Sequence, residues 1–309
     1  MKIIVTTYPF KEDSSYIKEL KDMEHQVSFN PYKRKMSPTE VKSLMEKENP
    51  DIIIAGTEKY DSDLLDTCTN LKMISRVGIG MDSVDLEETE KRGIYVTNTP
   101  DAPTNAVAEL TIGQMINSLR RVEQISNDLK NGGWDRHIGK ELKNSKVGII
   151  GCGRIGKSVI KKLKGFDVKE ILMYDIDQTT YSHIENTTIS DKNNILKECD
   201  IISIHIPYND DNHDYITSKE FSLMRNGSIL INMSRGGIIN ENNLYNWLYN
   251  NEDSYACIDV FEKEPYGGNL TNLVNISLTP HLGSCSMKSR EEMEFHSVKN
   301  VIEYLENES

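Results

Sequence analysis

Three polar side chains follow apolar, strand-like runs in the second half of the chain. They are Arg235 in INMSRGG, Glu264 in DVFEKEP and His281 in LTPHLG. An imidazole can take or give a proton near neutrality because its ordinary pKa is about 6.5. A neighbouring carboxylate would fix its tautomer, and a guanidinium offers a planar fork to carboxylate or carbonyl oxygens. Together the three groups suit removal of hydride from a 2-hydroxy acid, whereas each alone is more typical of a structural or surface position.

A glycine-rich turn stands at the end of the run KVGII. Gly151, Gly153 and Gly156 form the pattern Gly-x-Gly-x-x-Gly, and Arg154 and Ile155 open a segment with helical spacing. In this setting the glycines permit a tight turn, the approach of a pyrophosphate to the backbone, and close packing of helix on strand. The helix N-terminus then faces the anion. The pattern predicts a dinucleotide site.

An acidic residue ends the next strand-like run. Asp175 lies about twenty residues beyond the glycines, where a carboxylate can accept hydrogen bonds from an adenosine ribose and would repel a 2′-phosphate. Asp177 follows it, and residues 176–180 contain no Arg or Lys. The expected cofactor is therefore NAD rather than NADP.

Short apolar runs alternate with amphipathic segments along the whole chain, which is typical of parallel strands joined by crossover helices. Helices are expected over Pro38–Glu48, from Val107 to the pair Gly132-Gly133, and over 286–306. The runs expected to form strands are KIIVTT (2–7), DIIIAG (51–56), KMISRV (72–77), KVGII (146–150), EILMYD (170–175), DIISIH (200–205), SILINM (228–233), YACIDV (255–260) and NISLT (275–279).

Composition narrows the class of protein. The chain has 309 residues, enough for about two domains, and a formal net charge of −12, which disfavours nucleic acid and anionic lipid as partners. Its five cysteines lack the Cys/His spacing of a zinc site, so no metal and a reducing cytoplasm are expected. No apolar run has the length of a membrane span or a signal peptide.

Six longer blocks resemble the D-isomer-specific 2-hydroxyacid dehydrogenase family. They are RVGIGMDSVDL (76–86), NTPDAPTNAVAELTIG (98–113), VGIIGCGRIGK (147–157), MRNGSILINMSRGG (224–237), DVFEKEP (259–265) and LTPHLGS (278–284). The blocks are spread over essentially the whole chain. The resemblance implies NAD-dependent hydride transfer between a 2-hydroxy acid and the corresponding 2-oxo acid.

The resemblance also implies roles for individual residues. His281 would be the proton donor and acceptor, Glu264 its orienting partner, and Arg235 the cation that binds and polarises the substrate. Beyond the glycine turn and Asp175, the implied cofactor contacts are Thr104, His205, Pro207 and Asp259. The segment HIPYNDDNHDYI (205–216) departs from the family pattern at Tyr208, Asn209 and Asn212, so cofactor contacts there are less well defined.

Further residues are implied to bind the substrate. Its carboxylate would rest on backbone N–H groups of Val77, Gly78 and Ile79, where glycine permits close approach. Lys59, with Arg76 as a second candidate, would meet a substrate phosphate, although Lys59 is equally well explained as a solvated surface lysine.

The fold implied is α/β, with two Rossmann-like, doubly wound parallel-sheet domains. A flavodoxin-like substrate-binding domain would comprise residues 1–98 and 285–309, and an NAD-binding domain would comprise residues 99–284. The substrate would lie in the cleft between them, with a hinge at the proline-containing segment NTPDAP. A homodimer formed through the long helix and arm near residues 105–140 is also implied.

Three functions are left open. The favoured substrate is a phosphoglycerate-like acid, and reduction of glyoxylate or hydroxypyruvate is the nearest alternative because it needs the same residues without a phosphate pocket. A different class is an NAD-sensing co-repressor-like binding protein. The presence of Arg235, Glu264 and His281 favours an enzyme.

Overall fold

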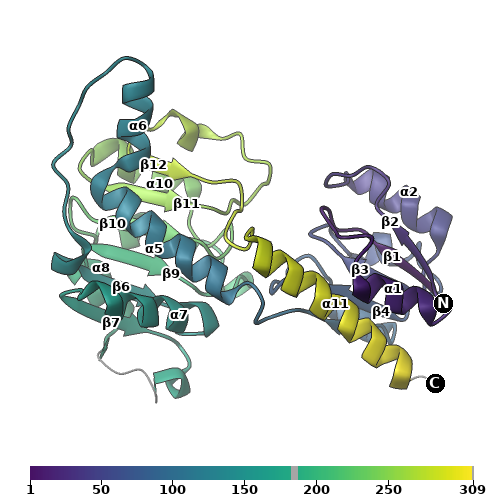
Figure 1. Ribbon diagram of the computed structural model, residues 1–309. Helices are drawn as coiled ribbons and strands as arrows, with labels where there is room; N and C mark the ends of the chain where they lie inside the picture. Colours follow the sequence, from purple (N-terminus) through teal and green to yellow (C-terminus); the bar gives the residue numbers. More distant parts are fainter. Residues whose placement is uncertain (182–186, 308–309) are drawn as a thin grey trace. The chain divides into compact units, whose positions relative to one another are not determined.

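The computed structural model describes residues 1–181 and 187–307 and forms two compact units (Figure 1). Unit 1 combines Met1–Pro103 with the C-terminal segment from Ser286, and unit 2 is Thr104–Cys285. Thr99 belongs to unit 1 because its N–H donates to the carbonyl of Gly78 at 3.0 Å and its hydroxyl accepts from the Gly78 N–H at 2.8 Å. The chain therefore enters unit 2 after Pro103 and returns at Ser286.

Unit 1 is built on a five-stranded parallel sheet in the order β2-β1-β3-β4-β5. Alternate residues of β1 face opposite helical layers, since Ile3 packs beneath α1 and α11 whereas Ile4 packs beneath α2 and α3. The strands are β1 (Lys2–Val5), β2 (Gln26–Phe29), β3 (Ile52–Ala55), β4 (Met73–Arg76) and β5 (Tyr95–Thr97). The helices are α1 (Ser15–Asp22), α2 (Pro38–Glu48), α3 (Ser62–Leu65), α4 (Leu86–Lys91) and α11 (Met287–Asn307).

Unit 2 is built on a seven-stranded parallel sheet in the order β12-β11-β10-β9-β6-β7-β8. Helices α5 and α7 cover one face, and α8, α9 and α10 cover the other. The strands are β6 (Lys146–Ile150), β7 (Glu170–Tyr174), β8 (Thr188–Ile189), β9 (Ile201–Ile204), β10 (Ile229–Asn232), β11 (Tyr255–Ile258) and β12 (Ile276–Leu278). The helices are α5 (Thr104–Arg120), α6 (Val122–Lys130), α7 (Arg154–Leu163), α8 (Lys192–Glu198), α9 (Ser218–Phe221) and α10 (Glu241–Asn250). Short 3₁₀ helices span Leu142–Asn144, Lys164–Phe166, Gln178–Tyr181, Asp210–Asn212 and Asn269–Asn272.

The predicted fold class is confirmed. The strand order of unit 1 is flavodoxin-like. In unit 2, β7 and β8 extend the sheet on one side of β6, and β9 to β12 extend it on the other side, so the order of strands reverses between β6 and β9. Ligands of such sheets bind beyond the carboxyl ends of the strands at this reversal. The sequence pattern does not predict β2, β5 and β8, because each is a short edge strand without a run of buried apolar residues.

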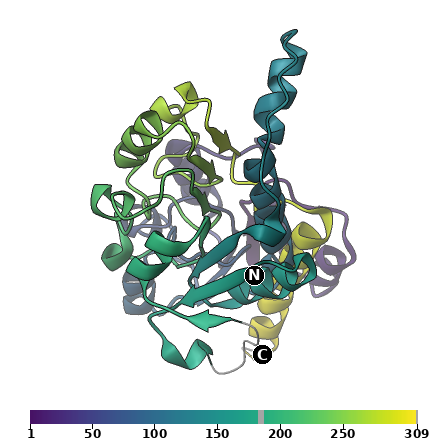
Figure 2. The same ribbon diagram turned by 90° about the vertical axis from the view of Figure 1, so that its left-hand side faces the viewer.

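The long helix expected to reach Gly132 is interrupted at Arg121. This residue has a left-handed backbone with φ +49°, and its guanidinium donates to the carbonyls of Glu252 and Asp253. Helix α6 continues beyond the break and projects from the rest of unit 2 (Figure 2), and none of its residues is buried. Among the described residues, no helix is both long enough and apolar enough to cross a membrane.

Candidate active site

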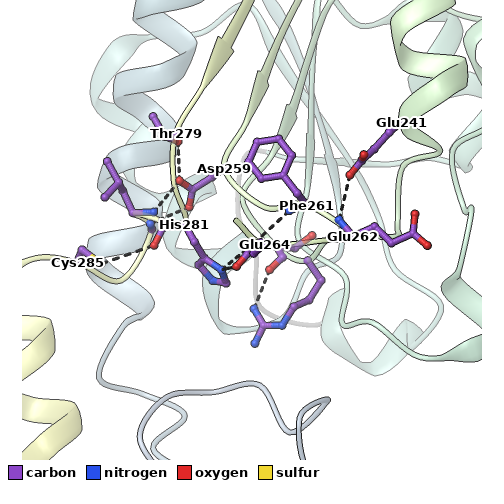
Figure 3. A network of polar contacts seen from close by, with 12 residues as sticks. Glu241, Asp259, Phe261, Glu262, Glu264, Thr279, His281 and Cys285 are labelled. Carbon is purple, nitrogen blue, oxygen red and sulfur yellow. Dashed lines mark hydrogen bonds and ion pairs between the residues drawn. The ribbon is translucent and has the colours of Figure 1, made fainter. Parts of the chain in front are cut away.

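The imidazole of His281 is held against the carboxylate of Glu264 (Figure 3). Its Nδ1 lies 3.0 Å from Oε2 and 3.1 Å from Oε1 of Glu264, and the backbone N–H of Phe261 donates to Oε1 at 3.2 Å. Because carboxylate oxygens accept, the proton of this contact sits on Nδ1. The other ring nitrogen, Nε2, is thereby the atom that can exchange a proton with a ligand.

A second carboxylate, that of Asp259, fixes the loop that carries His281. Asp259 is fully buried, and its oxygens accept from the Thr279 hydroxyl at 2.5 Å, the Leu282 N–H at 2.7 Å and the Gly283 N–H at 2.8 Å. Burial raises the pKa of Asp259, and these hydrogen bonds act in the opposite direction. His281 itself has a left-handed backbone with φ +55°, a strained conformation that the surrounding bonds maintain.

Arg235 lies in the loop after β10, next to the segment that leads to Glu264. A Cβ added at Gly236 would lie 2.0 Å from the carbonyl of Phe261, so the two stretches of backbone are in direct contact. The Arg235 loop is tied down by Asn232, whose side chain donates to the Arg235 carbonyl at 2.9 Å. The structure thus places Arg235, Glu264 and His281 at the carboxyl ends of β10, β11 and β12.

The three glycines of the turn after β6 meet different constraints. Gly151 has φ +97°, and a Cβ there would lie 2.5 Å from the carbonyl oxygen of His205; at Gly156 a Cβ would lie 2.0 Å from the carbonyl oxygen of Gly151. A Cβ at Gly153 would meet no atom within 4 Å in the part of the chain that is described. Protein packing therefore explains the first and third glycines, and the second faces open space at the start of α7.

The acidic residue after β7 lies beside this turn. Asp175 is half-buried, and its two oxygens accept from the N–H groups of Cys152 at 2.6 Å and Asp177 at 2.9 Å. Helix α7 begins at Arg154, an exposed residue, and its N-cap Gly153 provides no side-chain hydrogen bond, so the first N–H groups of the helix keep their positive potential.

Four buried polar side-chain atoms of unit 2 have no hydrogen-bond partner among the described residues, and two of them, Thr104 Oγ1 and His205 Nδ1, belong to residues expected to contact the cofactor. His205 follows β9 at the reversal of strand order, and its Nε2 lies 2.9 Å from Ser203 Oγ. Burial lowers the pKa of His205 to about 4, so its ring is neutral at physiological pH. Pro207 is exposed, and its carbonyl accepts from the Asn212 side chain at 3.0 Å.

The residues expected to bind substrate in unit 1 lie after β3, at the last residue of β4, and in the loop after β4. The Lys59 side chain is 77% exposed and pairs with Asp61 at 3.1 Å. Arg76 is buried and donates to the carbonyl of Val77. The Val77 N–H donates to the Ala55 carbonyl at 3.0 Å, and the Gly78 N–H donates to the Thr99 hydroxyl at 2.8 Å. A ligand carboxylate would have to compete with these acceptors for the two N–H groups.

Sequence reasoning missed two residues that the structure makes prominent. Thr279 completes the hydrogen bonding of Asp259, and its only sequence signal was its place inside the block LTPHLGS. Glu58, the neighbour of Lys59, is buried and accepts hydrogen bonds from Thr6 and Tyr60. A glutamate next to a lysine is typical of the protein surface, so nothing in the sequence indicates that Glu58 is buried.

Known proteins with similar sequences and structures identify the family of this chain. Residues 112–283 match the model of the family described as D-isomer specific 2-hydroxyacid dehydrogenase, NAD binding domain. The chain is 36% identical over 262 residues to a glyoxylate reductase of Thermofilum pendens, covering 82% of this chain and 77% of that protein. The chain belongs to the D-isomer-specific 2-hydroxyacid dehydrogenase family.

Two further relatives of this dehydrogenase differ in substrate. It is 36% identical over 256 residues to a D-3-phosphoglycerate dehydrogenase of Methanocaldococcus jannaschii, covering 80% of this chain but 48% of that protein. The solved structure of a D-lactate dehydrogenase from Aquifex aeolicus, complexed with NAD and lactic acid, matches with a TM-score of 0.83 and 26% identity, covering 99% of this chain and 96% of that one. The predicted family, oxidoreductase class and NAD cofactor are confirmed.

The described residues fit NAD on structural grounds. Open space at Gly153 beside an uncapped helix N-terminus suits a pyrophosphate, and the Asp175 carboxylate lies next to the turn, where a ribose can donate to it. The Thr104 hydroxyl and His205 Nδ1, which have no partner among the described residues, would be available to a bound dinucleotide.

Two glycine variants should separate packing from cofactor binding. Gly153→Ala should fold normally, because its added Cβ meets no described atom, yet raise the dissociation constant for NADH at least about tenfold by entering the pyrophosphate space. Gly156→Ala should lower the melting temperature, since its Cβ overlaps Gly151. Thermal unfolding and NADH fluorescence titration measure both; unchanged NADH affinity in Gly153→Ala would contradict the assignment.

The neutral His205 predicts an acid-dependent loss of stability. In the unfolded chain this ring takes up a proton as pH falls through about 6.5, whereas in the folded protein it stays neutral down to about 4. Its contribution is therefore complete above about pH 6.5 and declines as pH falls toward 4. Between about pH 7.5 and pH 5, His205→Asn should lose less melting temperature than the wild type, and His296→Asn, at an exposed position, should behave like the wild type. Equal losses in all three proteins would show that His205 titrates normally.

Proposed function

We propose that this protein reduces a small 2-oxo acid to the D-2-hydroxy acid, with His281 as acid, Glu264 as its orienting partner and Arg235 as the cation for the substrate. The observation that supports the proposal is the contact of His281 Nδ1 with both oxygens of Glu264 at the edge that also holds Arg235. NADH, when bound, supplies the hydride.

The proton chemistry follows from this contact. Glu264 keeps the Nδ1 proton in place and stabilises the charged imidazolium, so Nε2 carries the proton that passes to the oxygen of the substrate as its carbonyl becomes an alkoxide. In the reverse direction Nε2 removes the hydroxyl proton. Arg235 offers two parallel N–H donors to the substrate carboxylate and attracts electron density toward the carbonyl oxygen. The proposed cofactor contacts are the glycine turn, Asp175, Thr104, His205, Pro207 and Asp259.

Among 2-oxo acids, we favour glyoxylate and hydroxypyruvate. A phosphate at the substrate needs cations that are available to it. Lys59 points into solvent and pairs with Asp61, while Arg76 is buried against a backbone carbonyl. A carboxylate needs no phosphate-binding cation. Because the Val77 N–H already donates to the Ala55 carbonyl, the carboxylate's proposed donors in this loop are the N–H of Gly78, which would leave the Thr99 hydroxyl, and the N–H of Ile79.

Oxidation of 3-phosphoglycerate is the second candidate. The block RVGIGMDSVDL supports it, as does the exposed ammonium of Lys59, which can leave its surface ion pair at little energetic cost. The M. jannaschii relative carries this activity in its name.

We further propose that two copies associate through α6 and the arm that follows it. Trp134 is 82% exposed and Ile138 is 96% exposed, which is unusual for large apolar side chains, and α6 has no buried residue. A second copy of the chain would remove these groups from water. All five cysteines are free thiols, in keeping with a cytoplasmic location.

Turnover of NADH tests the proposed reaction. The purified protein should oxidise NADH with glyoxylate or hydroxypyruvate, and His281→Asn should lower kcat by about 10²- to 10⁴-fold with NADH affinity retained, because proton transfer is lost and cofactor contacts are not. His296→Asn, at an exposed position of unit 1 outside the proposed site, is the control and should keep wild-type kcat. Absence of turnover with every 2-oxo acid offered, or full activity in His281→Asn, would refute the proposal.

Light scattering after size exclusion tests the association. The wild type should elute at twice the chain mass of 35.2 kDa, and the double variant Trp134→Glu/Ile138→Glu should elute at the chain mass, because burying two carboxylates in an apolar contact is costly. Val274→Glu changes an apolar residue of unit 2 that is 72% exposed and lies outside the arm, and it should stay dimeric. A monomeric wild type would contradict the proposal.

A further inference from the structure

The loop that carries Arg235 lies against two other loops of unit 2. It joins β10 to α10, and its residue Gly236 is in direct contact with the backbone of Phe261, in the loop after β11. The next residue, Gly237, is covered by side chains of the loop after β9. This second contact involves two aromatic side chains that no step of the proposed reaction uses.

The ring of Tyr208 lies directly over Gly237. A Cβ added at Gly237 would lie 2.9 Å from Cε2 of Tyr208 and 3.5 Å from Cδ2 of His213. The two rings also meet edge to face, with centroids 6.3 Å apart and planes at 82°. Gly237 is buried and has φ +76°, a left-handed backbone that favours glycine. Glycine at this position therefore permits both the turn after Arg235 and the close approach of the tyrosine ring.

Backbone hydrogen bonds join the same two loops. The N–H of Asp214 donates to the carbonyl of Gly237 at 2.8 Å, and the N–H of Ile216 donates to the carbonyl of Ile238 at 3.0 Å. The side chain of Asn240 donates to both carboxylate oxygens of Asp214 at 3.2 Å. These bonds restrain the carbonyl of Gly237 and the residues that follow it, and the neighbouring tyrosine ring restrains its Cα.

His213 connects this pair of rings with the third loop. Its Nε2 lies 3.8 Å from a carboxylate oxygen of Glu262, and its Nδ1 lies 3.7 Å from a carboxylate oxygen of Asp214. The N–H of Glu262 donates at 3.0 Å to the side chain of Glu241, the first residue of α10 (Figure 3). The loops after β9, β10 and β11 therefore meet at the rings of Tyr208 and His213, within one folding unit.

We propose that Tyr208 is a positioning residue for Arg235. Its ring, lying on Gly237, keeps the loop after β10 in the position from which the guanidinium binds the substrate carboxylate. The inference rests on the proposed 2-oxo acid reduction. A tyrosine ring suits this task because it gives a large contact surface with few rotatable bonds, whereas a glycine has no side chain to restrain its own backbone.

Tyr208 acts through the geometry of the Arg235 fork. Two parallel N–H donors bind a carboxylate well only when both point at its oxygens, so a small displacement of the loop weakens binding of the acid. Pro207, which precedes Tyr208 and is a proposed cofactor contact, is held separately, since its carbonyl accepts from the Asn212 side chain at 3.0 Å. Loss of the ring should therefore affect the acid more than the dinucleotide.

Replacement of the ring tests the proposal. Tyr208→Leu should raise KM for glyoxylate at least about tenfold, with the dissociation constant for NADH within about twofold of the wild type. Tyr208→Phe keeps the ring and should retain the wild-type KM. Tyr245→Leu is the matched control, because Tyr245 is also half-buried against the same apolar core of unit 2 and stacks on Tyr249, and it should keep the wild-type KM. An unchanged KM in Tyr208→Leu, or a loss of NADH affinity as large as the change in KM, would overturn the proposal.

An exposed residue gives a second test that does not endanger folding. His213→Ala removes the ring that meets Tyr208 edge to face, and it should raise KM for glyoxylate about threefold in the same direction, again without a change in NADH affinity. If Tyr208→Leu does not fold, an unchanged KM in His213→Ala refutes the positioning role.

A double-variant cycle shows whether Tyr208 acts through Arg235. Arg235→Lys keeps the charge but loses the planar fork whose position Tyr208 is proposed to maintain. In this background Tyr208→Leu should change kcat/KM for glyoxylate by less than about twofold, because residues that act as one unit have non-additive effects. The same tenfold loss in both backgrounds would show that Tyr208 acts independently of Arg235.

The same measurements separate this inference from the function on which it rests. If the wild type reduces no 2-oxo acid, the proposed function itself fails. If the wild type reduces glyoxylate but KM does not respond to loss of the ring at position 208, only the positioning role fails.

Discussion

The buried carboxylate of Asp259 is the interaction on which the reactive edge of unit 2 depends. An ionised carboxyl group without water is costly unless donors surround it, and here Thr279, Leu282 and Gly283 supply three. Because two of these donors are backbone N–H groups immediately after His281, satisfying the acid also dictates the path of the loop. The left-handed backbone of His281 follows from that path. Glu264 then needs only to orient a ring whose position is already determined.

The topology of each sheet determines which polar groups lie at its carboxyl edge. In unit 2 the order of strands reverses between β6 and β9, and this places the glycine turn, Thr104 and His205 where a dinucleotide can meet uncapped N–H groups and unpartnered polar atoms. Arg235, Glu264 and His281 lie farther along the same sheet, after β10, β11 and β12. Unit 1 has its own parallel sheet, with the buried Glu58 and Arg76 near the carboxyl ends of β3 and β4.

Local patterns were enough to predict much of this arrangement. Helix α2 begins at Pro38 and ends at Glu48, as predicted. Ser37 and Glu40 form a capping box, in which each side chain accepts a hydrogen bond from the backbone N–H of the other residue, and proline suits the first turn. The break at Arg121 had no such signal, since it depends on carbonyls of Glu252 and Asp253 far along the chain. The same limit applies at the site. The contact of His281 with Glu264 follows from motifs after neighbouring strands, whereas the inward turn of Glu58 and the outward turn of Lys59 depend on Gly56, Thr6 and Asp61 together.

Helix α11 is translated after unit 2, yet it covers the sheet of unit 1, whose strands are translated before unit 2. Ile3, Val5 and Ile54 lie against Met293, Val298 and Val301, and Ser75 donates to the carbonyl of Ser297 at 2.8 Å. During synthesis the ribosome must add all of Thr104–Cys285 before this cover exists, which takes on the order of ten to forty seconds at about 5–20 residues per second. During that interval the apolar face of the unit 1 sheet lacks the cover of α11, whereas unit 2 can already complete its own core. Unit 1 can therefore complete its core only after unit 2 has been translated, although the strands of its sheet are translated before unit 2.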